Sequence, residues 1–378
     1  MKVSVIVPTF NRANYIAECL DSLLTQSMPA HEIIVVDDGS EDGTSELLEA
    51  YGTRIRYVRK ENGGKPSAVN LGLSLAEGDL IWIFDDDDVA LADAIETRVA
   101  VLSLHPEAGF VYSPHFYGSD GPGGRIARGR PHVLPQIAHE QLLSVLMEGC
   151  FFHLATALVR ASAYRTLGGF DTNLLSSEDY DMQLRLARHF RGVVSTAPCF
   201  VFRQHTGLRG AKAIRYAGAD RGKVFRRFDQ RVGHKLRAEL PLGDYLVPRQ
   251  ADGLSAQQQR QALLARAVVM GSKGCIPELL QDAATALSHH VEGHSLSHSE
   301  YEQLARAIRT GYAYDALGDQ GWGGAGWEAP LLAQPGGRKA ILALADGIWR
   351  MARGYPGSAR ERWQKLRSAA MTALVALK

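Results

Sequence analysis

Residues 80–88 read LIWIFDDDD, a short apolar run that ends in four consecutive aspartates. The run is rich in aromatic and branched side chains and follows Gly78-Asp79, a pattern that predicts a buried strand. Neighbouring carboxylates repel one another, and their charges are costly unless water or a cation neutralises them. An isolated aspartate run is best read as a solvated turn. This one ends a core strand, where α/β proteins bind ligands, and its hard oxygens suit Mg²⁺ or Mn²⁺.

Working outward from this run, apolar segments alternate with helical patterns through the first hundred residues. Strands are predicted at Val3–Val7, Glu32–Val36, Ile55–Val58 and Leu80–Phe84, and helices at Tyr15–Thr25, Thr44–Tyr51 and Ser67–Ala76. Single helices between strands imply βαβ crossovers and a mostly parallel sheet, an α/β fold. The first, second and fourth strands end in polar residues, so three separate segments are expected to converge on one crevice.

The pattern is less regular from about residue 91 onward. Further elements are predicted as helices at Asp93–Leu104 and Glu178–Phe190, strands at Phe110–Tyr112, Thr156–Arg160 and Cys199–Phe202, and an irregular glycine-rich stretch at 118–129. From about residue 211 the sequence is rich in Ala, Leu, Arg and Gln at helical spacing. We therefore predict an α/β domain over residues 1–210 and a helical region over residues 211–378.

Composition narrows the class of protein. With 46% hydrophobic and 22% charged residues, the 378-residue chain is expected to bury a sizeable core. A net charge of +1 argues against a general nucleic-acid binder. The cysteines are far apart and are expected to be reduced, buried thiols; they are Cys19, Cys150, Cys199 and Cys275. With no signal-peptide pattern and no apolar stretch near the roughly 20 residues of a membrane span, a cytoplasmic protein is expected.

Two polar segments carry weaker signals of nucleotide binding. Asp38 follows a strand, where its carboxylate can accept a hydrogen bond from a ring N–H such as that of uracil. Residues 62–65, Asn-Gly-Gly-Lys, suit a flexible backbone beside a diphosphate, with Lys65 near the negative charge. An ordinary Asp-Gly turn and an ordinary helix start explain the same residues, so neither segment is specific when taken singly.

The order and spacing of these segments are more specific. Seven motifs resemble those of the inverting, nucleotide-sugar-dependent family 2 glycosyltransferases of the GT-A fold, in the order of that family: VIVPTFNR at 5–12, VVDDGS at 35–40, NGGKPSAVN at 62–70, FDDDD at 84–88, GGFD at 168–171, SEDYDMQLRL at 177–186 and FRQH at 202–205. The resemblance covers roughly residues 1 to 210. It implies a Rossmann-like, mostly parallel sheet that binds a nucleotide sugar.

The resemblance also implies roles for individual residues. Asp87 is the first choice as a ligand of Mn²⁺ or Mg²⁺, with Asp88 and His205 beside it, although a surface histidine after a strand is an alternative for His205. The residues expected to bind the nucleotide sugar are Pro8, Thr9, Arg12, Asp38, Lys65, Asp85 and Asp86. Among them, Asp38 is expected to recognise uracil, and Asp86 fills the variable position of a D-x-D-D segment.

Asp179 is the predicted general base, with Glu178 as the second choice. In an inverting transfer the acceptor hydroxyl attacks the anomeric carbon opposite the leaving nucleotide, and a carboxylate must take its proton. Asp179 begins a predicted helix after a turn-rich segment, and helix N-termini favour anions. The alternative is that these acids only cap the helix, with Ser176 or Ser177 as N-cap.

Together these features predict a metal-dependent transfer of sugar from a UDP-sugar to a hydroxyl acceptor: a growing surface polysaccharide, a lipid-linked oligosaccharide or a small glycoside. The main alternative is a non-catalytic module that binds sugar nucleotides or glycans. A sugar nucleotidyltransferase or a dinucleotide dehydrogenase would need a glycine-rich loop after the first strand, where this chain has Pro8 to Arg12 without a glycine.

The C-terminal region has a basic segment at residues 338–378. Its basic residues are Arg338, Lys339, Arg350, Arg353, Arg360, Arg362, Lys365, Arg367 and Lys378, against Asp346 and Glu361 alone. Trp349 and Trp363 are interspersed among them. Such a segment suits peripheral contact with anionic lipid at the inner membrane face. A solvated face of a packed helix explains it equally well.

Overall fold

The computed structural model describes residues 1–121, 124–205, 207, 220–251, 253–289, 296–309, 312, 327–354 and 372. The chain divides into two compact units, which are described separately. Unit 1 comprises residues 1–146 and 150–228, and unit 2 comprises residues 147–149 and 229–378. The sequence-predicted boundary between residues 210 and 211 lies outside the described residues.

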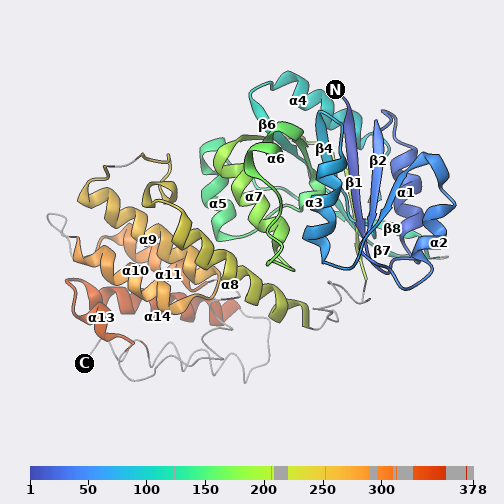
Figure 1. Ribbon diagram of the computed structural model, residues 1–378. Coiled ribbons are helices and arrows are strands. Elements are labelled where there is room, and N and C mark those ends of the chain that lie inside the picture. The colour runs from blue at the N-terminus through green and yellow to red at the C-terminus, as the bar shows by residue number, and fades with distance from the viewer. Residues whose placement is uncertain are drawn as a thin grey trace. The chain divides into compact units, whose positions relative to one another are not determined.

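Unit 1 is built on a seven-stranded sheet with the order β10-β6-β9-β4-β1-β2-β3 (Figure 1). Its strands are β1 (Val3–Thr9), β2 (Glu32–Asp37), β3 (Arg56–Arg59), β4 (Leu80–Ile83), β6 (Ala108–Tyr112), β9 (Ala157–Arg160) and β10 (Arg191–Val194). β9 runs antiparallel to β4 and β6, and the other pairs are parallel. The predicted mostly parallel α/β sheet is therefore confirmed.

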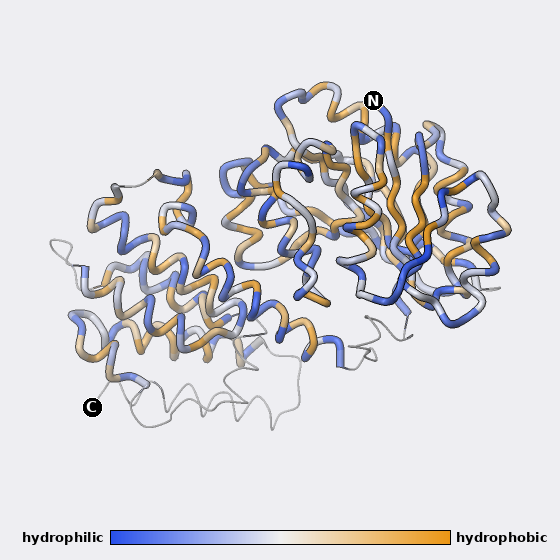
Figure 2. Tube along the Cα trace, viewed as in Figure 1, coloured by the Kyte–Doolittle hydropathy of each residue, from blue (hydrophilic) through white to orange (hydrophobic). Residues whose placement is uncertain are grey.

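The helices of unit 1 are α1 (Ile16–Leu24), α2 (Thr44–Glu49), α3 (Lys65–Leu75), α4 (Ala94–Leu104), α5 (Leu142–Glu148), α6 (Ala161–Leu167) and α7 (Glu178–His189). Alternation along β2 explains how helices cover the sheet: Ile33 and Val35 pack with α1, whereas Ile34 and Val36 pack with α3. Because both faces are covered, the central strands are mainly apolar, as Figure 2 shows.

Close packing fixes α3 against the sheet. A Cβ on Gly72 of α3 would lie 2.4 Å from Cγ2 of Ile6 in β1.

On the strand that precedes the aspartates, Trp82 is fully buried and donates a hydrogen bond to the carbonyl of Ala155 at 2.7 Å. The buried guanidinium of Arg98 lies 3.9 Å from the centre of the Trp82 ring. These contacts leave the ends of β1 and β4 firmly placed.

A second sheet in unit 1 has the order β5-β11-β7-β8. It consists of β5 (Val89–Ala90), β11 (Phe200–Gln204), β7 (Phe116–Asp120) and β8 (Ile126–Pro131). β7 and β8 pair antiparallel, so both ends of the glycine-rich stretch at 118–129 lie in strands, for which no strand was predicted from the sequence. The strand signal was hidden because β8 is largely exposed and therefore carries polar residues.

Unit 2 is helical in its described residues, as predicted. Its helices are the end of α8 (Arg221–Glu239), α9 (Ala256–Ser272), α10 (Ile276–Ser288), α11 (His298–Ala307), α13 (Ala329–Leu332) and α14 (Gly337–Gly354). Ser255 and Ser297 cap α9 and α11 through capping boxes with Gln258 and Glu300. Among the described residues, no helix is both long and apolar enough to span a bilayer.

The cysteine expectation needs one correction. Cys19, Cys199 and Cys275 are buried free thiols, but Cys150 is exposed. Cys150 follows α5. At this residue the chain returns to unit 1 after residues 147–149, which belong to unit 2.

Candidate active site

The carboxyl ends of three parallel strands bring remote segments together in unit 1. β1 ends at Thr9, β2 ends at Asp37, and the aspartate run follows β4. The backbone N–H of Asp38 donates to the carbonyl of Thr9 at 2.9 Å, which ties the first two ends together. The strand ends that were predicted to converge therefore lie together, with Pro8 and Thr9 buried there.

The Asp38 carboxylate organises the glycine loop that precedes α3. One oxygen accepts hydrogen bonds from Lys60 Nζ at 2.8 Å and from the N–H of Gly63 at 2.9 Å. The other accepts from the N–H of Gly64 at 2.7 Å. A carboxylate has about four lone-pair positions, so it has capacity for one further donor. The predicted role in recognising a base is compatible with this arrangement and stays a prediction.

Arg12 and Asp86 form a buried pair beside the strand ends. Arg12 Nε lies 3.3 Å from Asp86 Oδ1, and the side chains are 15% and 12% exposed. Burial raises the pKa of Asp86 to about 6, with Asp87 adding to the rise, while Arg12 and the Thr9 hydroxyl oppose it. The pair places two of the predicted nucleotide-binding residues in contact.

Asp87 and His205 meet although they are 118 residues apart in the sequence. His205 Nε2 lies 2.8 Å from Asp87 Oδ2, and both side chains are less than a tenth exposed. The imidazole also packs on the ring of Tyr15, with 5.1 Å between the ring centres. Because a carboxylate oxygen and an imidazole nitrogen face one point, this pair fits a divalent cation such as Mn²⁺. A surface position for His205 is excluded by its burial.

Asp88 lies differently. It is fully buried, and its Oδ1 accepts a hydrogen bond from the backbone N–H of Arg203 at 2.8 Å. In this arrangement the carboxylate joins the aspartate loop, residues 85–88, to β11. Its predicted place among the metal ligands stays a prediction.

Arg203 is a residue whose role the sequence did not reveal. Its guanidinium is 1% exposed, donates to the carbonyl of Asp87 at 2.8 Å and forms ion pairs with Glu18 and Asp120. It therefore connects α1, β7 and the aspartate loop. An arginine in an otherwise apolar strand, FVFRQ, is the signal that could have indicated it.

Lys65 lies between two acidic segments. Its Nζ is 2.5 Å from Asp85 Oδ1 and 3.8 Å from Glu178 Oε1. Burial alone would lower the pKa of Lys65, but Asp85 and Glu178 outweigh it and raise the pKa. The pKa of Glu178 rises to about 7 because the side chain is buried; Lys65 opposes this rise and Asp179 adds to it.

Asp179 is the more accessible of the two acids that begin α7. It is partly exposed, whereas Glu178 is 6% exposed. Asp179 Oδ1 accepts a hydrogen bond from the N–H of Tyr180 at 2.8 Å. Ser177 occupies the N-cap position with a left-handed φ of 61° and makes no side-chain capping bond. A side-chain cap from Ser177 therefore does not explain how this helix begins. A left-handed backbone at a non-glycine residue is strained, and such strain clusters at functional sites.

A cluster of histidines that the sequence did not single out lies near Asp179. His115 is fully buried and stacks on His132, with 4.4 Å between ring centres, while His153 lies 5.0 Å away in an edge contact. Burial lowers the pKa of His153, and the charges of Asp179 and Asp85 oppose that shift. Burial, with His153 and His132, lowers the pKa of His115 to about 3, so that ring stays neutral.

Known proteins resemble the part of the chain that forms this site. A family described as "Glycosyl transferase family 2" matches residues 4–168. An uncharacterized glycosyltransferase of Rickettsia typhi is 32% identical over 200 residues, covering 49% of this chain and 58% of the relative. Chondroitin synthase of Pasteurella multocida is 32% identical over 188 residues, covering 49% of this chain and 19% of the relative.

The chain spans only part of such relatives: 31% of a Rickettsia felis glycosyltransferase, 58% of the R. typhi protein and 19% of the chondroitin synthase. Among solved structures, S. aureus TarS 1-349 aligns with a TM-score of 0.50 at 18% identity, covering 99% of this chain and 90% of that one. That likeness concerns the fold alone. Residues 4–168 therefore match the domain of glycosyl transferase family 2, and the N-terminal unit has the GT-A fold.

Proposed function

We propose that this protein transfers a sugar from a nucleoside-diphosphate sugar, most simply a UDP-sugar, to a hydroxyl group of an acceptor with inversion at the anomeric carbon. One observation carries the proposal: the Asp87–His205 pair and the Lys65–Asp85–Glu178 cluster lie beside the same strand ends. Asp179, next to Glu178, is partly exposed, whereas Glu178 is buried.

In this proposal Asp87 and His205 hold Mn²⁺ or Mg²⁺. When bound, such a cation supplies Lewis-acid neutralisation of a diphosphate leaving group. Arg12 and Lys65 add positive charge beside the aspartate run, where phosphate oxygens would enter. Asp38 accepts the ring N–H of uracil, which its remaining acceptor capacity permits.

Asp179 acts as the general base. The acceptor hydroxyl oxygen forms a bond to the anomeric carbon while the bond from that carbon to the diphosphate oxygen breaks. The hydroxyl proton passes to a carboxylate oxygen of Asp179, and the diphosphate leaves with the bonding electron pair. The charge of Lys65, held by Asp85 and Glu178, lies close to this acid without neutralising it directly.

The acceptor is proposed to be a glycan, in the synthesis of a surface polysaccharide or glycoconjugate. Support comes from relatives named chondroitin synthase and hyaluronan synthase.

Replacing Asp179 by Asn tests the proposed base. General-base catalysis contributes roughly 10²–10⁴-fold, so turnover of a UDP-sugar should fall by about that factor, measured as UDP release with a glycan acceptor. Donor binding should be retained, because the amide preserves the shape of the side chain. The matched control is Glu46→Gln on the exposed face of α2, which should leave turnover unchanged.

A thermal-shift panel of nucleotides and nucleotide sugars, with and without Mn²⁺, tests the donor. Stabilisation follows preferential binding to the folded state, so a metal-dependent shift with uridine compounds is expected. A shift with uridine compounds but no turnover in the unmodified protein with any glycan acceptor would favour the binding module instead. Unchanged turnover in Asp179→Asn would remove Asp179 as the base.

A further inference from the structure

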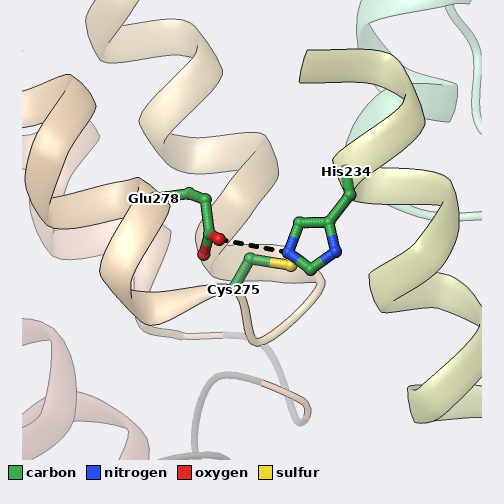
Figure 3. Close-up of side chains that lie close together, drawn as sticks. All are labelled: His234, Cys275 and Glu278. Atoms are coloured by element: carbon green, nitrogen blue, oxygen red, sulfur yellow. Dashed lines mark hydrogen bonds and ion pairs between the residues drawn. The ribbon is translucent and has the colours of Figure 1, made fainter. Parts of the chain in front are cut away.

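Three side chains with metal-binding atoms meet in unit 2, apart from the candidate active site. They are His234 on α8, Cys275 at the N-cap of α10 and Glu278 in the first turn of α10 (Figure 3). One ligand atom from each residue lies within 4.8 Å of the other two. His234 Nε2 and Glu278 Oε1 are 3.1 Å apart.

The spacing suits a small tetrahedral shell. Zinc lies about 2.0–2.3 Å from nitrogen, oxygen and sulfur ligands, so neighbouring ligand atoms in such a shell are roughly 3.3–3.6 Å apart. The His234–Glu278 separation is already close to that value. The sulfur is placed toward the same point in Figure 3, so small side-chain rotations would complete the shell.

The chemistry of the three donors also fits. Imidazole nitrogen, thiolate sulfur and carboxylate oxygen are a ligand set for zinc, and one thiolate with one carboxylate balances two positive charges. His234 is 55% exposed, which provides an entry path and a solvent position for a fourth, water ligand.

An ion pair between His234 and Glu278 beside a buried thiol is the simpler reading. It does not explain why the sulfur lies at the same point. Cys275 is 3% exposed, and the hydrogen bond recorded for its thiol within the described residues is a long one, 3.9 Å to the carbonyl of Gln230. Burial, with Glu278, raises the pKa of Cys275 to about 12, while Lys273 and Arg237 oppose the rise.

We propose that His234, Cys275 and Glu278 form a zinc site that holds the C-terminal half of α8 against the start of α10. The close approach of the two segments favours this role, because a Cβ on Gly233 would lie 3.5 Å from the Cys275 sulfur. Binding displaces the thiol proton, so affinity for the metal rises with pH. This site is separate from the proposed Asp87–His205 site, which has no sulfur ligand.

Titration of the full chain with Co²⁺, a spectroscopic substitute for zinc, tests the proposal. A thiolate ligand produces a sulfur-to-cobalt charge-transfer band, which the oxygen- and nitrogen-donor active site does not give. The band should appear in the unmodified chain and in Cys150→Ser, disappear in Cys275→Ser, and be displaced by Zn²⁺. His234→Ala and Glu278→Gln should each weaken Co²⁺ binding by at least roughly tenfold. Loss of a residue that only supports a metal ligand already weakens metal affinity by about that factor.

Glu278→Gln guards against loss of folding, because its side-chain oxygen still accepts a hydrogen bond from His234. In the presence of a chelator it should melt at the temperature of the unmodified chain. Zinc should raise the melting temperature of the unmodified chain and raise that of Cys275→Ser much less. Absence of the band in the unmodified chain, or its persistence in Cys275→Ser, would overturn the proposal, as would unchanged Co²⁺ affinity in both other variants.

Discussion

At the scale of single residues, the raised pKa of Glu178 makes the folding stability of the protein depend on pH. Its pKa of about 7 lies above the ordinary value of 4.5, chiefly because the carboxyl is buried. The folded state therefore holds this proton more tightly than the unfolded state between those values. Stability is greatest below the unfolded pKa and falls as pH rises toward 7, since ionising the buried group becomes a cost of folding.

Glu178→Gln is therefore expected to flatten this part of the pH profile. A folded-state pKa that lies one pH unit above the unfolded one corresponds to about 1.4 kcal/mol of stability, so the variant should gain up to about 3 kcal/mol relative to the unmodified chain between pH 5 and pH 8. Urea unfolding at several pH values measures it. An equal fall in both proteins would show that another group is responsible.

Arg203 is expected to place the aspartate loop. Arg203→Met leaves Glu18 and Asp120 without their shared partner and removes the donor to the Asp87 carbonyl. Breaking a buried pair costs about 3–5 kcal/mol, but these carboxylates are partly exposed, so a loss of about 2–3 kcal/mol is expected. The Mn²⁺-dependent nucleotide shift should weaken as well, because Asp87 loses its support.

The matched control is Arg128→Met on the exposed strand β8, whose guanidinium lies 4.3 Å from the centre of the Phe116 ring. Such exposed contacts contribute about 0.5–1 kcal/mol. A loss of stability in Arg203→Met no larger than in this control would argue against the proposed placement.

At the scale of elements, the contact between α3 and β1 depends on a missing side chain. Gly72→Ala would place a Cβ 2.4 Å from a methyl group of Ile6, so the helix must move away from the strand. Overpacking of this kind costs about 1–3 kcal/mol. Gly222→Ala at the start of α8 is the control, since no atom lies within 4 Å of its Cβ position.

The control should be neutral or slightly stabilising, because alanine favours helix by up to about 1 kcal/mol over glycine. Chemical unfolding of both variants gives the comparison. If Gly72→Ala proved as stable as Gly222→Ala, the close packing of α3 on β1 would not hold in solution.

Much of the element order was predictable because a strand that is buried on both faces has a continuous apolar sequence. β1, β2 and β4 follow that rule, whereas β3 is partly exposed and the helices were predicted from helical spacing. β11 of the second sheet was predicted because it is buried, whereas β8 and β10 were missed because they carry arginines at exposed positions. The pairing of Asp87 with His205 was expected only through a resemblance, because periodicity cannot specify contacts between distant segments.

At the scale of the whole molecule, the basic segment at 338–378 divides into two parts. Residues 338–354 form α14, whose Ile341, Leu344 and Ile348 are fully buried, and Arg350 is paired with Glu302 and Asp346. The predicted basic residues Arg360, Arg362, Lys365, Arg367 and Lys378, with Trp363, lie outside the described residues. Deleting the entire segment would remove core residues of unit 2.

A chain ending at Gly354 is therefore the informative variant for lipid contact. If residues 355–378 meet anionic lipid, sedimentation with anionic vesicles should fall several-fold in this variant. Neutral vesicles should sediment neither protein. Equal sedimentation of both chains would rule out these residues as the contact.

The burial of Trp82 gives unit 1 a natural optical label. Of the 5 tryptophans in the chain, it alone precedes residue 320, and its indole lies in a dry core beneath a guanidinium. Its fluorescence should therefore be blue-shifted and should change only when unit 1 opens. With phenylalanine at the remaining four positions, emission from this one ring would follow the folding of unit 1 without any attached dye.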